Sequence, residues 1–228
     1  MATPPTRNKL FPIVFLAAGL SLQVAAYLWM PDSPWSLVSG MLGICSVILC
    51  SEGNILTFLF GFGQILTYTY LCYLERFYAG IAMNTFYFCS QIYGIYAWRK
   101  RLITSDDEQA TMYIRTRRLS LKTIAVMLPV IISVSLLTGC LLHHFTDDTQ
   151  PYFDAFTTVP AIAAQLLMVT AYREQWYIWL MIDILYVAMW AQAGNACMVM
   201  QYAFWCANCI YGLRQWTRHS DDNSANGS

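Results

Sequence analysis

Residues 175–192, QWYIWLMIDILYVAMWAQ, are almost entirely apolar and carry one formal charge, Asp183. Polar or turn-forming residues bound this run on both sides, Arg173-Glu174 before it and Gly194-Asn195 after it. A run of about 20 apolar residues is long enough to cross the hydrocarbon core of a bilayer as an α-helix. We therefore predict a membrane-spanning helix here.

The composition of the whole chain agrees with lipid as the solvent. Of the 228 residues, 57% are apolar and only 11% are charged, whereas a soluble domain has about 25% charged residues. Lys and Arg together number 13, as do Asp and Glu, so no net positive charge indicates a nucleic-acid partner. Eight spans would use about 160 residues, which leaves no room for a separate soluble catalytic domain.

Eight such runs are present, each bounded by charged or turn-forming residues. They lie at 10–30, 35–51, 55–74, 77–98, 123–142, 155–172, 175–192 and 196–213. The chain is accordingly divided into an N-terminal tail with an extra span (1–34), a first three-helix unit (35–98), a basic loop, linker helix and outer loop (99–152), a second three-helix unit (153–218) and a disordered tail (219–228).

The basic residues predict the orientation of the spans. With eight crossings, one side of the membrane receives both termini, the 99–122 loop and Arg173, and therefore twelve of the 13 Lys and Arg residues; the other side receives only Arg76. Cytoplasmic loops of membrane proteins carry the excess of Lys and Arg. Both termini are therefore expected to face the cytoplasm.

An internal repeat relates the two three-helix units. Shifting the chain by 118 residues aligns Tyr93-Gly94 with Tyr211-Gly212, aligns Trp98 with Trp216, and superposes the turns that end the middle span of each unit. Four crossings separate equivalent spans, so the two units point the same way. Parallel repeats of this kind occur in transporters, whose substrate site lies near the midplane between the repeats. We predict an all-α membrane protein of eight transmembrane helices: two parallel three-helix repeats, a linker helix between them and an extra N-terminal helix.

Asp183 is the most informative residue within the spans. A charge at mid-bilayer costs roughly 2.5–3.5 kcal/mol on insertion scales, so this carboxylate is expected to face a wet cavity as a ligand contact, or the protein interior as an anchor between helices. Four aromatic residues recur with it at steps of three and four and form one stripe of the helix. Of these, Trp179 and Tyr186 are predicted to contact a flat ligand ring, and Trp176 and Trp190 to lie in the aromatic belt at the membrane surface.

Uncharged polar and aromatic side chains on the other spans are the remaining candidates for a binding site. Amides and hydroxyls hydrogen-bond to a ligand without charging the cavity, although each is also typical of contacts between helices. The candidates are Gln64, Asn84, Gln91, Thr157, Gln165, Trp205 and Asn208. The eight cysteines all fall within the predicted spans, where they are typical small apolar residues, and no nucleophile–base pair or complete metal-ligand set is present, so we predict no catalytic residue, metal or cofactor.

Several of these motifs resemble the PnuC family of vitamin transporters. The most specific is the Trp-x-x-Trp-x-x-x-Asp of residues 176–183; the match extends over about residues 36–218. Further matching segments are DAFTTV at 154–159, Ala164-Gln165, GLRQW at 212–216, Asn54, Tyr78-Ala79, Gln91 and YGIYAW at 93–98. The resemblance implies two parallel three-helix bundles joined by a linker helix, a SWEET-like arrangement, assembled as a homotrimer in the bacterial cytoplasmic membrane.

The resemblance also implies a function. Such proteins carry water-soluble vitamins by facilitated diffusion with alternating access, and phosphorylation in the cytoplasm traps the vitamin. Nicotinamide riboside is the favoured substrate, with ligand contacts at Trp179 and Asp183 and further contacts at Gln64, Gln91 and Asn208. Carriers of that riboside often have Asn where this chain has Asp183, so thiamin or another vitamin or nucleoside is the alternative substrate. A membrane-embedded vitamin sensor without flux is the alternative of another class.

Overall fold

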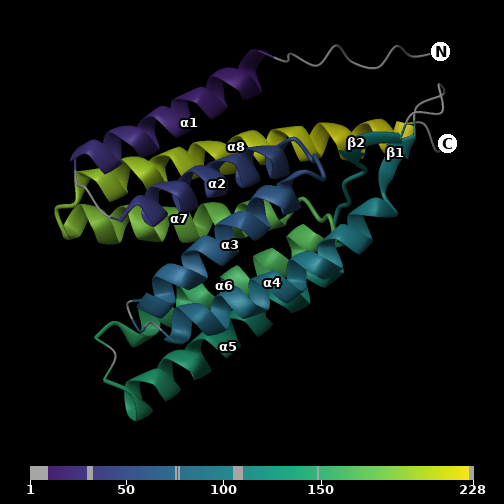
Figure 1. Cartoon of the computed structure of the whole chain (residues 1–228). Helices are drawn as coiled ribbons and strands as arrows, with labels where there is room; N and C mark the ends of the chain where they lie inside the picture. Colours follow the sequence, from purple (N-terminus) through teal and green to yellow (C-terminus); the bar gives the residue numbers. More distant parts are fainter. Residues whose placement is uncertain are drawn as a thin grey trace.

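The computed structural model describes residues 10–29, 33–74, 76, 78–104, 110–147 and 149–225 (Figure 1). Over these residues the chain forms eight α-helices, as predicted, and one two-stranded sheet. The helices are α1 (Leu10–Trp29), α2 (Pro34–Ser51), α3 (Thr57–Leu74), α4 (Tyr78–Arg99), α5 (Leu121–Phe145), α6 (Pro151–Val169), α7 (Gln175–Gln192) and α8 (Ala196–Ala225).

The helices differ in how apolar they are. By length and composition over the described residues, α1, α2, α5 and α6 are the candidate membrane spans. The other four, α3, α4, α7 and α8, carry many of the amide, carboxylate and tyrosine side chains that line a cavity between the helices. Polar groups directed inward lower the average hydropathy of a helix without exposing those groups to lipid.

The structure corrects two expectations about polar segments. The predicted basic loop between α4 and α5 contains the antiparallel strands β1 (Leu102–Thr104) and β2 (Ala110–Ile114), because it includes β-branched residues that favour strand pairing. Helix α8 continues to Ala225, so the predicted disorder is wrong for residues 219–225. No Gly or Pro lies between 213 and 226, and extending a formed helix adds one backbone hydrogen bond per residue. The tail at 1–9 and residues 226–228 lie outside the described residues.

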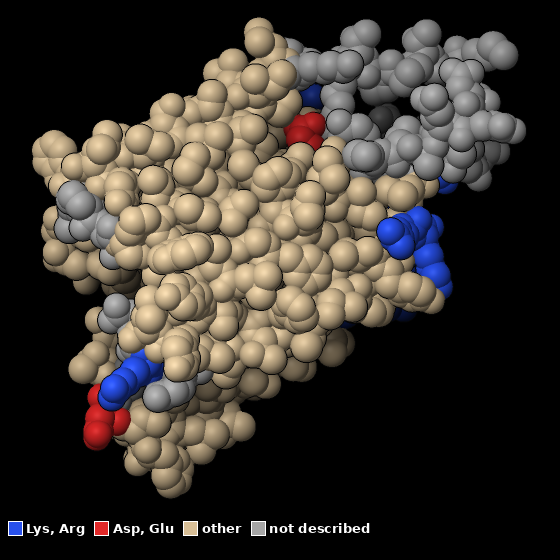
Figure 2. Space-filling model, viewed as in Figure 1, with Lys and Arg blue, Asp and Glu red and all other residues tan. Residues whose placement is uncertain are grey.

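The connections between helices gather at two ends of the bundle (Figure 1). The hairpin of β1 and β2, the α2–α3 turn and the α6–α7 turn lie at one end, here called the hairpin end. The α1–α2, α3–α4, α5–α6 and α7–α8 connections lie at the opposite end. On the face shown in Figure 2, Lys and Arg gather mainly at the hairpin end, and the middle of the face is uncharged.

The helices pack as two three-helix units with two additions. Helices α2, α3 and α4 pack in sequence, as do α6, α7 and α8; α5 packs on α6, and α1 packs on α2 and α8. The two units contact each other through α2 with α8 and through α4 with α6. The first helix of each unit therefore contacts the last helix of the other, which is the pattern that two repeats related by a two-fold axis produce.

Hydrogen bonds at the hairpin end follow the same pattern. The indole Nε1 of Trp98 donates to the Met168 carbonyl oxygen at 3.1 Å, and that of Trp216 donates to the Cys50 carbonyl oxygen at 2.9 Å. Both donors and both acceptors are 118 residues apart, the offset at which the sequence repeats. The last helix of each unit is thus tied to the first helix of the other by an equivalent bond, which supports the predicted repeat.

The backbone conformation supports it as well. Among the described residues, positive φ angles occur at Gly53 (68°), Ala171 (65°), Arg76 (54°) and Gly194 (72°). These residues form two pairs at the offset of 118, and each pair occupies the same turn of the two units. A left-handed conformation is costly for Ala and Arg, so the surrounding turn imposes it on both units, whether or not Gly is present.

The core closes the hairpin end. Trp98, Trp216 and Ile114 of β2 are each 0% exposed and belong to one apolar cluster. Behind them, the Thr116 hydroxyl donates to the Trp216 carbonyl oxygen at 2.7 Å. Ile114 at the end of the hairpin and Thr116 just after it therefore pack against the ends of α4 and α8.

Candidate functional site

A cavity of about 340 Å³, here called the main cavity, lies between the two three-helix units. All six helices of the units contribute to its wall, and none of the described lining residues comes from α1 or α5. The wall consists of Ser46, Val47, Cys50, Thr57, Gln64, Ile65, Tyr68, Asn84, Tyr87, Gln91, Gln165, Met168, Gln175, Trp176, Trp179, Asp183, Tyr202, Trp205, Asn208 and Cys209. The site thus lies between the units, where the parallel repeat predicts it.

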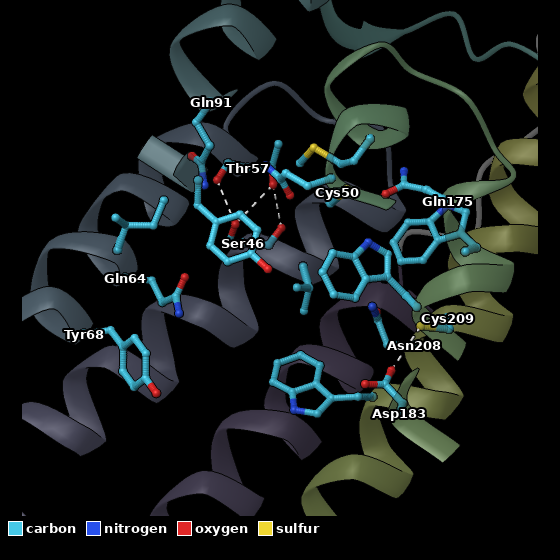
Figure 3. A pocket seen from close by; sticks show the side chains of 18 of the residues that line it. Ser46, Cys50, Thr57, Gln64, Tyr68, Gln91, Gln175, Asp183, Asn208 and Cys209 are labelled. Carbon is cyan, nitrogen blue, oxygen red and sulfur yellow. Dashed lines mark hydrogen bonds between the residues drawn. The ribbon is translucent and has the colours of Figure 1, made fainter. Parts of the chain in front are cut away.

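Asp183 lies in this wall on α7 and is 8% exposed. The thiol of Cys209 on α8 donates to its Oδ2 at 3.3 Å (Figure 3). Trp179, one helical turn earlier, lines the same cavity. A carboxylate and an aromatic face are therefore presented together by one helix, which suits a flat cationic ring.

Hydroxyl groups fix the opposite wall. Ser46 and Thr57 each donate to the carbonyl oxygen of the other residue, at 2.9 and 2.8 Å, and so join α2 to α3 (Figure 3). Because both hydroxyl protons are used within the fold, these groups shape the cavity and offer a ligand only acceptor capacity.

Two amides in the wall are held by serines. Gln165 Nε2 donates to the Ser90 hydroxyl at 2.9 Å, and the Ser51 hydroxyl donates to Asn208 Oδ1 at 2.9 Å. Each of these bonds joins the two three-helix units. One end of each amide is thereby fixed in place, which orients the side chain before a ligand arrives.

On α4, two further amides carry buried atoms with no hydrogen-bond partner in the described part of the structure. These atoms are Asn84 Nδ2 and Gln91 Oε1, both on α4 and both in residues that line the main cavity. Buried polar atoms are rarely left without a partner, because the loss costs about 1–3 kcal/mol. A donor and an acceptor are therefore available on one helix for a hydroxylated ligand.

The structure brings most of the predicted site residues together. Trp179, Asp183, Gln64, Asn84, Gln91, Gln165, Trp205 and Asn208 all line the main cavity. Tyr186 and Thr157 are not among the lining residues. Tyr186 stacks on Tyr202 with ring centroids 4.7 Å apart, and the Thr157 hydroxyl donates to the Phe153 carbonyl oxygen at 3.0 Å in its own helix.

The prediction for Trp176 was wrong. It is 3% exposed and lines the main cavity, although its place near the helix end indicated the membrane belt. A Cβ added to Gly212 would lie 2.6 Å from the Trp176 ring, so the absence of a side chain there lets the indole lie on α8. The Tyr-Gly motif around Gly212 was visible in the sequence, but its packing partner was not.

Several other lining residues were not among the predicted site residues. They include the tyrosines Tyr68, Tyr87 and Tyr202, together with Ser46, Thr57 and Gln175. Tyrosine and hydroxyl residues are common in membrane helices, so their composition alone does not separate the cavity face from other faces. Among the described lining residues, Asp183 is the formal charge, and Lys, Arg and His do not occur.

Residues 33–218 match the family model described as nicotinamide mononucleotide transporter. The chain belongs to this family, the PnuC transporters. It is therefore a multi-pass membrane transporter rather than an enzyme, and the resemblance read from the sequence is confirmed.

Individual relatives agree over nearly the whole chain. The nicotinamide riboside transporter PnuC of Haemophilus influenzae is 30% identical over 213 residues, which are 92% of this chain and 91% of the relative. The protein of the same name in Neisseria mucosa is 28% identical over 216 residues, 91% of this chain and 81% of the relative. The crystal structure of the vitamin B3 transporter PnuC has a TM-score of 0.77 at 27% identity and covers 93% of this chain and 92% of the other.

Proposed function

We propose that this PnuC chain carries nicotinamide riboside across the bacterial cytoplasmic membrane by facilitated diffusion. The observation that carries the proposal is the main cavity, which is uncharged except for Asp183 and lined by aromatic and amide side chains. Its volume of about 340 Å³ lies within the usual range of small-molecule sites. The pyridinium ring of the riboside is a flat cation, and the ribose offers hydroxyls to the amides.

The charge of the cavity also discriminates between the riboside and its nucleotide. The family description names the mononucleotide, whereas the relatives named above are riboside transporters. A phosphate group carries about −1.5 to −2 charges at neutral pH and needs cationic or amide N–H partners. The described lining residues offer no Lys, Arg or His and include a carboxylate, so the wall favours the riboside.

In the bound state we place the ring against Trp179 with the Asp183 carboxylate beside it. The ribose and carboxamide groups then face the amide and aromatic residues of the other helices, Gln64, Asn84, Gln91, Gln165, Trp205 and Asn208. Tyr186 acts on the site through the Tyr202 ring that it stacks on. Thr157 stabilises α6 and does not contact the substrate.

The two ends of the bundle predict the orientation of the carrier in the membrane. Twelve of the 13 Lys and Arg residues belong to the hairpin-end side of the predicted topology, so we place that end and both termini in the cytoplasm. The conformation described here is closed at the hairpin end by Trp98, Trp216 and Ile114. Rocking of the two units would open that end in turn, and phosphorylation in the cytoplasm would then trap the riboside.

The test is uptake of labelled nicotinamide riboside into liposomes that contain only this protein. We expect entry down the gradient, which stops at equal concentrations, and no entry of nicotinamide mononucleotide. Calorimetry on the purified protein should show tighter binding of the riboside than of thiamin. Tighter thiamin binding would overturn the choice of substrate, and tight riboside binding without entry would indicate a sensor.

The oligomeric state is a separate part of the proposal. The resemblance to PnuC proteins implies a homotrimer, with each protomer holding its own main cavity between its own helices. Native mass spectrometry of the detergent-solubilised protein should give three times the 26.0 kDa chain mass. A monomeric mass under several mild detergents would contradict the trimer without affecting the proposal for transport.

A further inference from the structure

We infer that a second cavity beside the main one is an entry site, where the riboside binds weakly before it moves on to Asp183. This entry cavity has a volume of about 640 Å³ and is lined by α1, α2, α3, α8 and the residue that precedes α8. The inference rests on the proposed function, because it concerns the path that leads to the main cavity.

The two cavities adjoin each other. Gln64, Tyr68 and Trp205 line both of them. The remaining walls lie toward different ends: the main cavity reaches Cys50 and Thr57 near the hairpin end, and the entry cavity reaches Ser36 and Asn195 at the opposite end. A solute that enters at the opposite end therefore meets the entry cavity first and passes the three shared residues next.

The chemistry of the entry cavity differs from that of the main cavity. Its described lining carries no formal charge and offers the amides of Gln23, Gln64, Asn195 and Gln201 beside aromatic side chains such as Tyr27. Neutral amides next to aromatic faces suit the hydroxyls and ring of a nucleoside but give no preference for a cation. Recognition of the charged ring is thus postponed until the substrate reaches Asp183.

Helix α1 forms one wall of the entry cavity. It lies outside both three-helix units and packs on α2 and α8. Its Gln23 side chain lies over Gly40 of α2, where an added Cβ would be 3.0 Å from Gln23 Oε1. The glycine makes room for the amide, so α1 supplies one wall of the entry cavity and presents a polar group to it.

The entry site is tested by the kinetics of binding. Stopped-flow tryptophan fluorescence follows nicotinamide riboside binding to the full-length protein in detergent, and calorimetry gives its Kd. Gln23→Leu removes the amide, and Gly40→Ala displaces it with an added methyl group. Gln192→Leu is the matched control, because Gln192 is an exposed residue at the end of α7 that lines neither cavity.

An entry site on the path predicts a particular kinetic signature. Loss of one hydrogen bond that forms during entry should slow association and dissociation together, each by about fivefold, with Kd within twofold of the wild type. Uptake at low riboside concentration should fall by the same factor, and Gln192→Leu should behave as wild type. The thermal melt of each variant shows whether it is folded.

The outcomes separate the inference from the function on which it rests. Wild-type association rates in both folded variants would overturn the entry site and leave the proposed function in place. A lower affinity caused by faster dissociation alone would also overturn it, since Gln23 would then stabilise the final complex. Absence of riboside binding to the wild-type protein would contradict the proposed function itself.

Discussion

The first three-helix unit, α2–α4, and the second, α6–α8, are stabilised by equivalent contacts but line the cavity with different side chains. In each unit a tryptophan of the last helix, Trp98 or Trp216, donates to a carbonyl oxygen of the other unit. In each unit that indole packs edge-on against an aromatic ring near the start of the middle helix, Phe58 or Trp176. The framework is therefore shared.

The cavity positions at the same offset of 118 do not match. Asp183 of α7 corresponds to Ile65 of α3, and Trp179 corresponds to Gly61. All but Gly61 line the main cavity. Nicotinamide riboside has a ring at one end and a sugar at the other, so a symmetric wall would serve it poorly. The two units therefore share the tryptophan contacts that stabilise the fold and differ in the residues that line the cavity.

Two of the differences compensate each other in volume. The Gln91 amide of α4 lies over Gly61 of α3, whereas at the corresponding positions of the second unit the large residue is Trp179 on α7 and the small one is Cys209 on α8. A large side chain thus comes from the last helix in one unit and from the middle helix in the other. The space between the middle and last helices is therefore filled by an amide in the first unit and by an indole in the second.

Replacing either of the two buried tryptophans tests the shared framework. Trp98→Ala and Trp216→Ala should each lower the free energy of unfolding by about 3–5 kcal/mol, because each removes a buried indole and its hydrogen bond. Thermal unfolding in detergent measures the loss, and Trp29→Ala is the control, since Trp29 is 81% exposed. A large loss for one variant and none for the other would show that the two bonds are not equivalent.

The next effect concerns the cavity of the second unit. Trp179→Ala should weaken riboside binding by about 30-fold, the usual scale for an aromatic residue at the centre of a binding site, and leave the protein folded. Calorimetry measures the riboside affinity, and a thermal melt shows whether the variant is folded. Trp35→Ala, at a position that is 49% exposed and outside the main cavity, should change neither. Unchanged affinity in Trp179→Ala would place the ring elsewhere.

A smaller effect tests the cavity of the first unit. A Cβ at Gly61 would lie 2.7 Å from Gln91 Oε1, so Gly61→Ala should push the amide aside and weaken riboside binding by about fivefold, the value of one hydrogen bond. Gly63→Ala is the matched control on the same helix, because its Cβ would meet Leu42 Cδ1 at 3.1 Å and not a polar group. Equal affinities for the two variants, measured by calorimetry, would exclude Gln91 from the site.

The smallest effect distinguishes the substrates. Asp183→Asn removes the charge beside the pyridinium ring but keeps the size of the side chain and an acceptor for the Cys209 thiol. Because Trp179 and the amides still hold the riboside, its affinity should fall by only about threefold. Thiamin has no ribose to pair with the amides and depends more on the carboxylate, so its binding should weaken more. Calorimetry with both ligands gives the ratio. A larger loss for the riboside than for thiamin would reverse this interpretation.

Much of this architecture could be predicted from local sequence features. Apolar runs of membrane length predicted the eight helices, and the motifs around Gly94 and Gly212 predicted two similar units. From its depth alone, Asp183 could be predicted to avoid lipid, because a lone charge there is costly, whereas the choice between a cavity and an anchor between helices needed the structure. These features depend on residues close together in the chain or on a fixed offset, so they need no knowledge of which helices touch.

The remaining features depend on contacts between distant segments. Helical periodicity places Trp176, Trp179 and Tyr186 on one stripe, but only the packing of α8 shows that Trp176 lines the cavity and that Tyr202 lies against Tyr186. The same holds for the hairpin, whose Ile114 is buried because Trp98 and Trp216 surround it. A sequence fixes the spacing along each helix, whereas the rotation and neighbours of a helix are set by the joint packing of all of them, and that packing exists only in the folded chain.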